Sequence, residues 1–258
     1  MIFETHAHYD DSRFDEDRDV ILGQMKDAGI ERIINVGASI ESTKTTLELA
    51  EKYDFVYAAA GVHPSDIAGL NEESFAWLKE QAAKEKTAAI GEIGLDYYWD
   101  KEPSVQAAQR YWFGRQLKLA GETHLPVIIH SRDAGADTMQ VMKEQHAEEI
   151  PGVIHCYSYS KELALQFIKM GYYIGIGGVV TFKNARKLVE TVEAIPLERI
   201  LLETDCPYMA PEPFRGKRNS SLYLPYVVEK IAELKGVSKE EVECVTEENA
   251  RRLFTRVN

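Results

Sequence analysis

Short apolar segments typical of β-strands alternate with longer segments of helical period along the chain. Eight runs rich in Ile, Val, Tyr, Phe and Ala predict strands at residues 2–5, 32–36, 55–60, 88–93, 126–129, 153–154, 172–176 and 199–202. Apolar positions three or four apart predict helices at 17–28, 42–53, 72–84, 106–120, 134–146, 161–170 and 185–193, then at 222–234 and 239–254. Gly29, Gly121 and Gly171 follow three of these segments, as is common where helices end.

This alternation predicts a TIM barrel, the closed (β/α)₈ fold with parallel strands inside and helices outside. The length of 258 residues agrees with one such domain over residues 1–258, because these barrels often reach roughly 250 residues undivided. The sequence contains no low-complexity tract, internal repeat or composition change that would indicate a domain boundary. We therefore expect a single barrel domain.

Candidate metal ligands occur near the ends of the predicted strands. They are His6, His8, Glu92, His130, His155 and Asp205. Enzymes built on this barrel carry catalytic groups at the C-terminal ends of the strands, so these side chains are expected to meet in one active site. An open doubly wound sheet would bring together only a few of them at its switch point, which favours the barrel.

The first and fourth strands supply the strongest local patterns. His6 and His8 are two residues apart, so an extended backbone directs both imidazoles to one side, towards one cation. An isolated pair of this kind is equally explained by two hydrogen-bonded histidines in a polar loop. Glu92, between Gly91 and Gly94, has space to bridge two metal ions, although an ion-paired glutamate at a strand end is the alternative.

Three further residues are candidates for catalysis or support. Asp205 follows the last strand and is predicted to bind metal, accept a proton, or both, with a helix cap as the alternative. Glu203 is expected to orient a ligand histidine, and Asp96 to do the same or to cap a helix. His63, before Pro64, is predicted to contact substrate or protonate a leaving oxygen, unless its role is only structural.

The positively charged residues that would bind substrate occur in two short segments of the chain. Arg132 follows His130, and Arg215, Lys217 and Arg218 cluster after the last strand. Arginine binds phosphate through two parallel hydrogen bonds, although solvated loop charges are the alternative for each of these residues. Cys156 and Cys206 each follow a candidate ligand, and strand alternation predicts that both turn into the core.

Composition limits the class of partner. A net charge of −12 argues against a broad basic surface for nucleic acid, but bound divalent cations would neutralise part of it, so a phosphate substrate remains compatible. No apolar run reaches the roughly 18 residues of a membrane span, and no signal peptide is recognised, so we expect a cytoplasmic protein without membrane contact. The three cysteines lack metal-type spacing and are expected to be reduced thiols.

Several ordered motifs together resemble the TatD family of metal-dependent deoxyribonucleases. They are Thr5-His6-Ala7-His8, Gly61-Val62-His63-Pro64, Gly91-Glu92-Ile93-Gly94-Leu95-Asp96, His130-Ser131-Arg132, His155-Cys156 and Glu203-Thr204-Asp205-Cys206-Pro207. The resemblance implies an amidohydrolase-type, metallo-dependent hydrolase barrel with one or two metal ions and a magnesium-dependent DNase activity, 3′ to 5′ in some members. The family usually continues Arg-Asn with Glu-Pro, whereas here Arg218-Asn219 precedes Ser220-Ser221, which leaves substrate preference open.

The ligand set leads to a hypothesis of phosphodiester hydrolysis by a metal-activated hydroxide. The resemblance to the TatD family implies, more specifically, a 3′–5′ exonuclease acting on DNA. Imidazole ligands favour zinc, manganese or iron, while magnesium prefers oxygen ligands, so Zn, Mn and Mg all remain candidates. The alternative is an amide or ester hydrolase of the amidohydrolase superfamily, including aminoacyl-tRNA deacylation. Glu92 stands where many of those enzymes carry a modified lysine.

Overall fold

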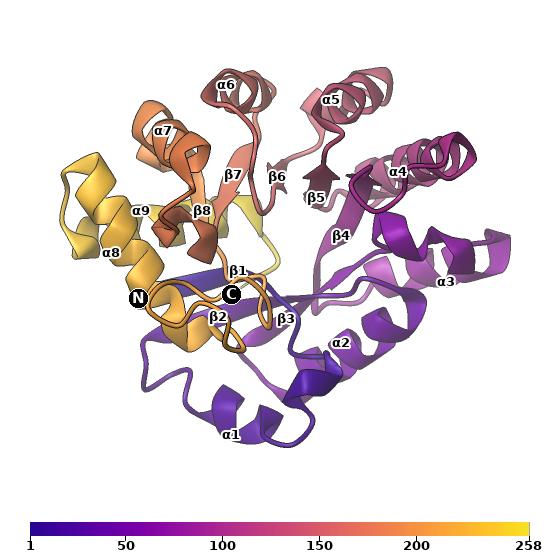
Figure 1. Cartoon of the computed structure of the whole chain (residues 1–258). Helices are drawn as coiled ribbons and strands as arrows, with labels where there is room; N and C mark the ends of the chain where they lie inside the picture. The colour runs from indigo at the N-terminus through magenta and orange to yellow at the C-terminus, as the bar shows by residue number, and fades with distance from the viewer. Residues whose placement is uncertain (258) are drawn as a thin grey trace.

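The computed structural model describes residues 1–257 and shows eight parallel strands arranged in the order in which they occur in the chain (Figure 1). The strands are β1 Ile2–Ala7, β2 Ile30–Val36, β3 Val56–Ala60, β4 Thr87–Asp96, β5 Val127–Arg132, β6 Gly152–Ile154, β7 Tyr173–Ile176 and β8 Ile200–Leu202. Each strand pairs with the next in parallel register. The helices lie outside the strands, so the predicted (β/α)₈ architecture is confirmed.

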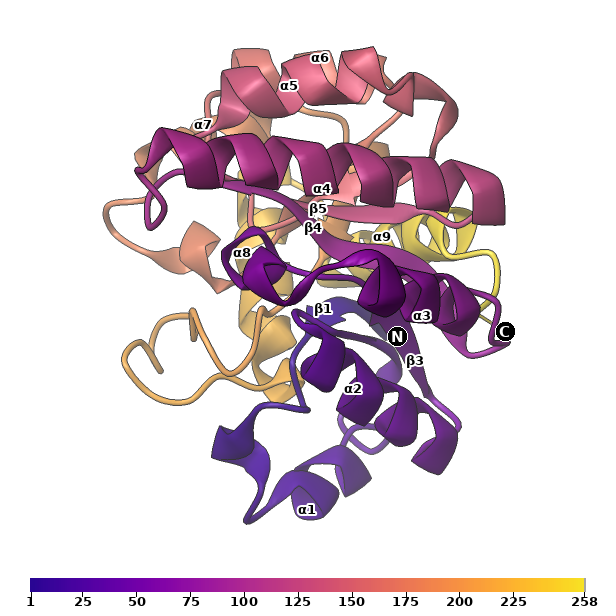
Figure 2. The ribbon, with the colours of Figure 1, turned by 90° about the vertical axis from the view of Figure 1, so that its right-hand side faces the viewer.

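The helices cover the outside of the barrel; α1 to α7 connect successive strands, and α8 and α9 follow the last strand. They are α1 Arg18–Gly23, α2 Ile40–Lys52, α3 Glu72–Ala82, α4 Pro103–Thr123, α5 Gly135–Glu144, α6 Lys161–Lys169, α7 Arg186–Ala194, α8 Leu224–Lys235 and α9 Lys239–Leu253. In Figure 2, the long loop before α8 projects from the side of the molecule opposite the two chain ends. No helix in residues 1–257 is both long and apolar enough to cross a membrane.

The barrel closes between β1 and β8 through a short seam. Ala7 and Cys206 form an isolated parallel bridge. The His8 backbone N–H donates to the Cys206 carbonyl at 2.8 Å, and the Asp205 N–H donates to the His6 carbonyl at 2.9 Å. Because candidate ligands themselves form the seam, closure of the barrel also fixes where these ligands lie.

Apolar side chains fill the end of the barrel where the strands begin. One buried cluster joins Phe3 of β1 and Leu201 of β8 to Phe254 and Val257 at the end of the chain. The rings of Phe3 and Phe254 lie 5.8 Å apart. This packing leaves the opposite end, where the strands finish, for polar residues.

The predicted elements differ from the structure mainly at their ends. β1 and β5 continue through His6 and His130, and β4 continues past Glu92 to Asp96, because backbone pairing with the neighbouring strands continues into the barrel mouth. Helix α1 stops at Gly23, and turns complete the predicted segment. The expectation that a helix ends at Gly121 was wrong: α4 continues to Thr123, and His124 takes the left-handed conformation there, at φ 54°.

Candidate active site

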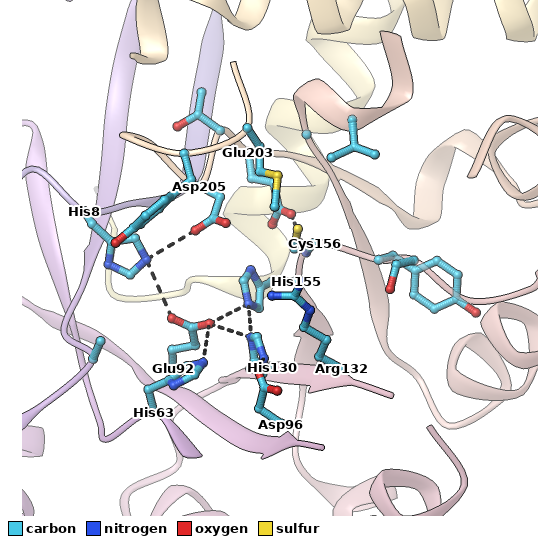
Figure 3. A pocket seen from close by; sticks show the side chains of 18 of the residues that line it. His8, His63, Glu92, Asp96, His130, Arg132, His155, Cys156, Glu203 and Asp205 are labelled. Carbon is cyan, nitrogen blue, oxygen red and sulfur yellow. Dashed lines mark hydrogen bonds and ion pairs between the residues drawn. The ribbon is translucent and has the colours of Figure 1, made fainter. Parts of the chain in front are cut away.

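The mouth of the barrel gathers polar side chains from most of the strands. All six predicted ligands lie there. His6, His8 and Asp205 each offer a ligand atom within 4.8 Å of the others, and so do His63, Glu92 and His130. Residues far apart in the chain thus form one compact group (Figure 3).

Glu92 occupies the centre of this group, and its two carboxylate oxygens face different histidines (Figure 3). Oε1 lies 2.9 Å from Nδ1 of His130 and 2.7 Å from Nε2 of His155. Oε2 lies 3.7 Å from Nε2 of His6 and 3.6 Å from Nε2 of His8. One carboxylate therefore faces two pairs of imidazoles, which is the arrangement expected of a bridging ligand.

Outer hydrogen bonds direct the free nitrogen of two histidines into the group. His8 Nδ1 is 2.8 Å from the Val36 carbonyl, so Nδ1 carries a proton and Nε2 faces inwards. His130 Nε2 is 3.1 Å from the Asp96 carboxylate, which leaves Nδ1 facing Glu92. Asp96 thus contacts a candidate ligand, as the sequence suggested, and also accepts hydrogen bonds from the backbone N–H groups of Tyr98 and Trp99.

Glu203 lies behind the other two histidines. The rings of His6 and His155 stack at 3.9 Å, and both residues offer an atom within 4.8 Å of Glu203. The buried Nδ1 atoms of His6 and His155 and Oε2 of Glu203 have no hydrogen-bond partner. Gly175 provides the space for this carboxylate, because a Cβ on Gly175 would lie 2.3 Å from Oε2.

The electrostatics of the group fit a bound cation. Imidazole nitrogens face each other at 3.0 Å between His6 and His8 and at 3.2 Å between His130 and His155. Two facing lone pairs repel unless a proton or a metal ion lies near them. A set of four imidazoles and two carboxylates around a buried centre is a donor set for zinc, manganese or iron.

Burial and neighbouring charges shift the pKa values of these groups in different directions. Burial and the charge of His155 lower the pKa of His6 to about 4. Burial also opposes protonation of His8, but the hydrogen bond to Asp205 and the charge of Glu92 outweigh it and raise its pKa to about 10. Burial raises the pKa of Glu92, but the surrounding histidines outweigh it and hold that pKa well below its usual range. The carboxylate is therefore ionised and available as a ligand.

The group forms the floor of a cavity of about 700 Å³. Its lining includes Asp10, Asp66, Tyr157, Phe182 and Met209 in addition to the candidate ligands other than His6, which is fully buried. Cys156 also lines the cavity, so the expectation that it turns into the core was wrong. β6 ends at Ile154, and Cys156 adopts φ 45°, which breaks the strand alternation. Cys206 is fully buried, as expected.

Only one of the four predicted substrate-binding cations lines this cavity, namely Arg132. Arg218 is paired with Asp17 and lies over the ring of Phe14. Arg215 stacks on Phe182 at 4.3 Å, and Lys217 lies 5.9 Å from the centre of the Phe214 ring.

His63 also borders the cavity, with Nε2 3.7 Å from Oε1 of Glu92. The backbone N–H of Ser65 donates to His63 Nδ1 at 3.1 Å, so Nε2 carries the proton and directs it into the cavity. Burial and the charge of His130 lower the pKa of His63 to about 3. The imidazole is therefore neutral and able to donate a hydrogen bond.

Comparison with known proteins supports the assignment that the motifs suggested. A sequence model of the family described as TatD related DNase matches residues 3–255. The chain belongs to the TatD related DNase family. The TatD resemblance stated from the motifs is confirmed.

TatD relatives match over nearly their whole length. The chain is 48% identical to the Bacillus subtilis (strain 168) protein named uncharacterized metal-dependent hydrolase YabD, over all of both chains. It is 34% identical to the Cronobacter sakazakii protein named 3′-5′ ssDNA/RNA exonuclease TatD, over 99% of this chain and 98% of that protein. The crystal structure of the Escherichia coli TatD homologue YJJV superposes with a TM-score of 0.92 at 32% identity, covering 98% of both chains.

Sequence reasoning missed a buried network beneath the ligands of this TatD protein. Glu4 accepts hydrogen bonds from the backbone N–H groups of His6 at 3.1 Å and Thr204 at 2.9 Å. The hydroxyls of Thr204 and Ser221 donate to its other oxygen at 2.7 and 2.8 Å. The period of two along β1 was the available signal, because it places Glu4 on the same face as His6 and His8.

Proposed function

We propose that this protein is a metal-dependent phosphodiesterase that removes nucleotides from the 3′ end of single-stranded nucleic acid. Membership of the TatD family supports this activity, as does the relative named as a 3′-5′ ssDNA/RNA exonuclease. The single structural observation that carries the proposal is the position of Glu92, whose two oxygens face separate pairs of histidines.

The ligand set fits two divalent ions. One ion would be held by His6, His8 and Asp205, and the other by His130 and His155, with Glu92 contacting both. Bound divalent ions lower the pKa of water towards 7 and stabilise the negative charge that develops on phosphoryl oxygens. Asp96 and Glu203 would orient the imidazoles from outside, which commonly matters 10- to 100-fold for metal affinity or activity.

The remaining residues would handle protons and the phosphate. Burial raises the pKa of Asp205, but its hydrogen bond to His8 and the nearby histidines outweigh burial and lower it, so the ionised carboxylate is suited to accept the proton of the attacking water. The Nε2–H of His63 would donate to the leaving oxygen. Arg132 would bind phosphate oxygens with its planar guanidinium.

The test is product analysis with a 5′-labelled single-stranded oligodeoxynucleotide and added Mg²⁺ or Mn²⁺. The wild type is expected to produce a ladder that shortens from the 3′ end. Glu92→Ala and Asp205→Ala are expected to abolish the ladder, whereas Asp27→Ala, which removes an exposed carboxylate outside the cavity, should not. Intact DNA together with hydrolysis of an ester or an aminoacyl-tRNA would overturn the substrate assignment in favour of carbonyl hydrolysis.

A further inference from the structure

An exposed tryptophan stands at the rim of the cavity. Trp99 has 67% of its surface exposed, the largest fraction among the exposed large apolar side chains of residues 1–257. It follows β4, the strand that carries Glu92, and it lines the same cavity as the candidate ligands. Leaving so much indole surface in water forfeits the free energy that its burial would supply. An exposed indole beside a ligand group is suited to contact with a bound substrate.

The rim around Trp99 is tied to the floor of the site. The carboxylate of Asp96 contacts His130 through one oxygen at 3.1 Å. Its other oxygen accepts hydrogen bonds from the backbone N–H groups of Tyr98 and Trp99, both at 3.0 Å. The same side chain that orients a candidate ligand therefore fixes the start of the aromatic segment, so the backbone at Trp99 has a defined position relative to the site.

A cation and a second ring complete this rim. The guanidinium of Arg132 lies 4.0 Å from the centre of the Tyr98 ring and 5.7 Å from that of Trp99. Tyr98 and Trp99 meet edge to face, with ring centres 4.8 Å apart. The Tyr98 ring thus positions the Arg132 guanidinium through a cation–π contact. Arg132 lines the cavity where a phosphate would enter. A positive group beside an exposed ring is the combination with which proteins bind single-stranded nucleic acid, through its backbone and its bases.

The depth of the ligand group limits which nucleic acid can use this rim. Glu92 and His155 are nearly buried at the floor of a cavity of about 700 Å³, within the range that encloses a small ligand. A scissile phosphate must enter this cavity, so the strand that carries it must leave its duplex. Its bases are then unpaired, and an exposed ring offers one of them a stacking partner.

We propose that Trp99 is a specificity residue on which a base of the bound strand stacks, while Arg132 binds the neighbouring phosphate, so that the site selects unpaired strands. This inference rests on the proposed function and adds to it a subsite for the base. It assigns to Trp99 binding of the base alone, without a part in breaking the phosphodiester bond.

The experiment compares two substrates that differ only in their bases. One is a 5′-labelled oligothymidylate, and the other is a phosphodiester chain of equal length whose sugars carry no base. Trp99→Ala should reduce kcat/KM on oligothymidylate by about 5- to 150-fold, the effect of losing one stacked base, mainly through KM. Trp99→Phe should retain most of the activity. On the baseless chain, wild type and Trp99→Ala should cleave at equal rates.

The control is Tyr111→Ala, which removes an aromatic side chain of 56% exposure that does not line the cavity. It should match the wild type on both substrates. The proposal is overturned if Trp99→Ala cleaves oligothymidylate as well as the wild type does. It is also overturned if the substitution lowers kcat/KM equally on both substrates, because the effect would then not depend on the base. If the wild type cleaves neither substrate, the proposed function itself fails, which is a distinct result.

Discussion

Replacement of Ser221 by alanine tests whether the buried network at the seam holds the barrel closed. Ser221 is fully buried, donates to Glu4 Oε2 at 2.8 Å and accepts a hydrogen bond from the Tyr9 hydroxyl at 2.9 Å. It stands in the segment where the chain departs from the usual family motif. Its side chain joins that segment to β1, which carries His6 and His8.

The magnitude follows from the contacts that the variant loses. Glu4 keeps its bonds from His6 and Thr204 but loses the one from Ser221. Burial raises the pKa of Glu4 to about 7, so above that pH the carboxylate is ionised, and a hydrogen bond to a charged group contributes about 1.5–3 kcal/mol. Tyr9 loses its nearest acceptor, and the hydroxyl of Ser220 at 3.4 Å is a weaker replacement. We expect Ser221→Ala to lower the free energy of unfolding by about 2–4 kcal/mol. At roughly 2–4 °C per kcal/mol, the Tm should fall by about 4–16 °C.

The assay is thermal and urea denaturation of the metal-loaded protein, with Ser220→Ala as the matched control. Ser220 contacts Tyr9 only at 3.4 Å and accepts from the Leu222 N–H at 3.3 Å, so its loss should cost clearly less. Equal stability of Ser221→Ala and the wild type would refute the reasoning, because the hydroxyl would then contribute nothing to the seam. A larger loss in Ser220→Ala than in Ser221→Ala would refute it as well.

Three further outcomes can be checked in the same protein. Gly175→Ala would place a Cβ 2.3 Å from the Glu203 carboxylate and displace it. A titration with Zn²⁺ or Mn²⁺ should then show metal affinity reduced by about 10- to 100-fold. Unchanged affinity would exclude a role for Glu203 in orienting the histidine ligands. Arg218→Ala should leave kcat/KM on a single-stranded oligonucleotide unchanged, because Arg218 pairs with Asp17 outside the cavity. A clear fall in kcat/KM would instead show that Arg218 binds the substrate. Removal of divalent ions with a chelator should lower the Tm. Adding Zn²⁺ or Mn²⁺ at 100 times its Kd should then raise the free energy of unfolding by about 2.7 kcal/mol. A Tm that does not change with metal concentration would contradict a metal site in the folded state.

The linear sequence determined the architecture because the two periodicities, two for strands and about 3.6 for helices, are local properties of the chain. Parallel strands in a barrel all end on the same side, so polar residues near their ends had to converge. This is why His6, Glu92 and His155 were recognised as neighbours without coordinates. The strand ends were less well placed, because pairing between neighbouring strands extends β1, β4 and β5 through polar residues.

Tertiary structure alone decided which groups act together across the barrel. Arg132 and Arg218 look equivalent in sequence, but packing places one in the cavity and pairs the other with Asp17. Glu4 accepts a hydrogen bond from Ser221, 217 residues further along the chain, and no local sequence pattern predicts this contact. Side-chain direction, ion pairing and hydrogen-bond partners depend on which elements lie side by side. The chain therefore specifies its donor set locally, while its geometry and its supporting contacts arise only when the barrel closes.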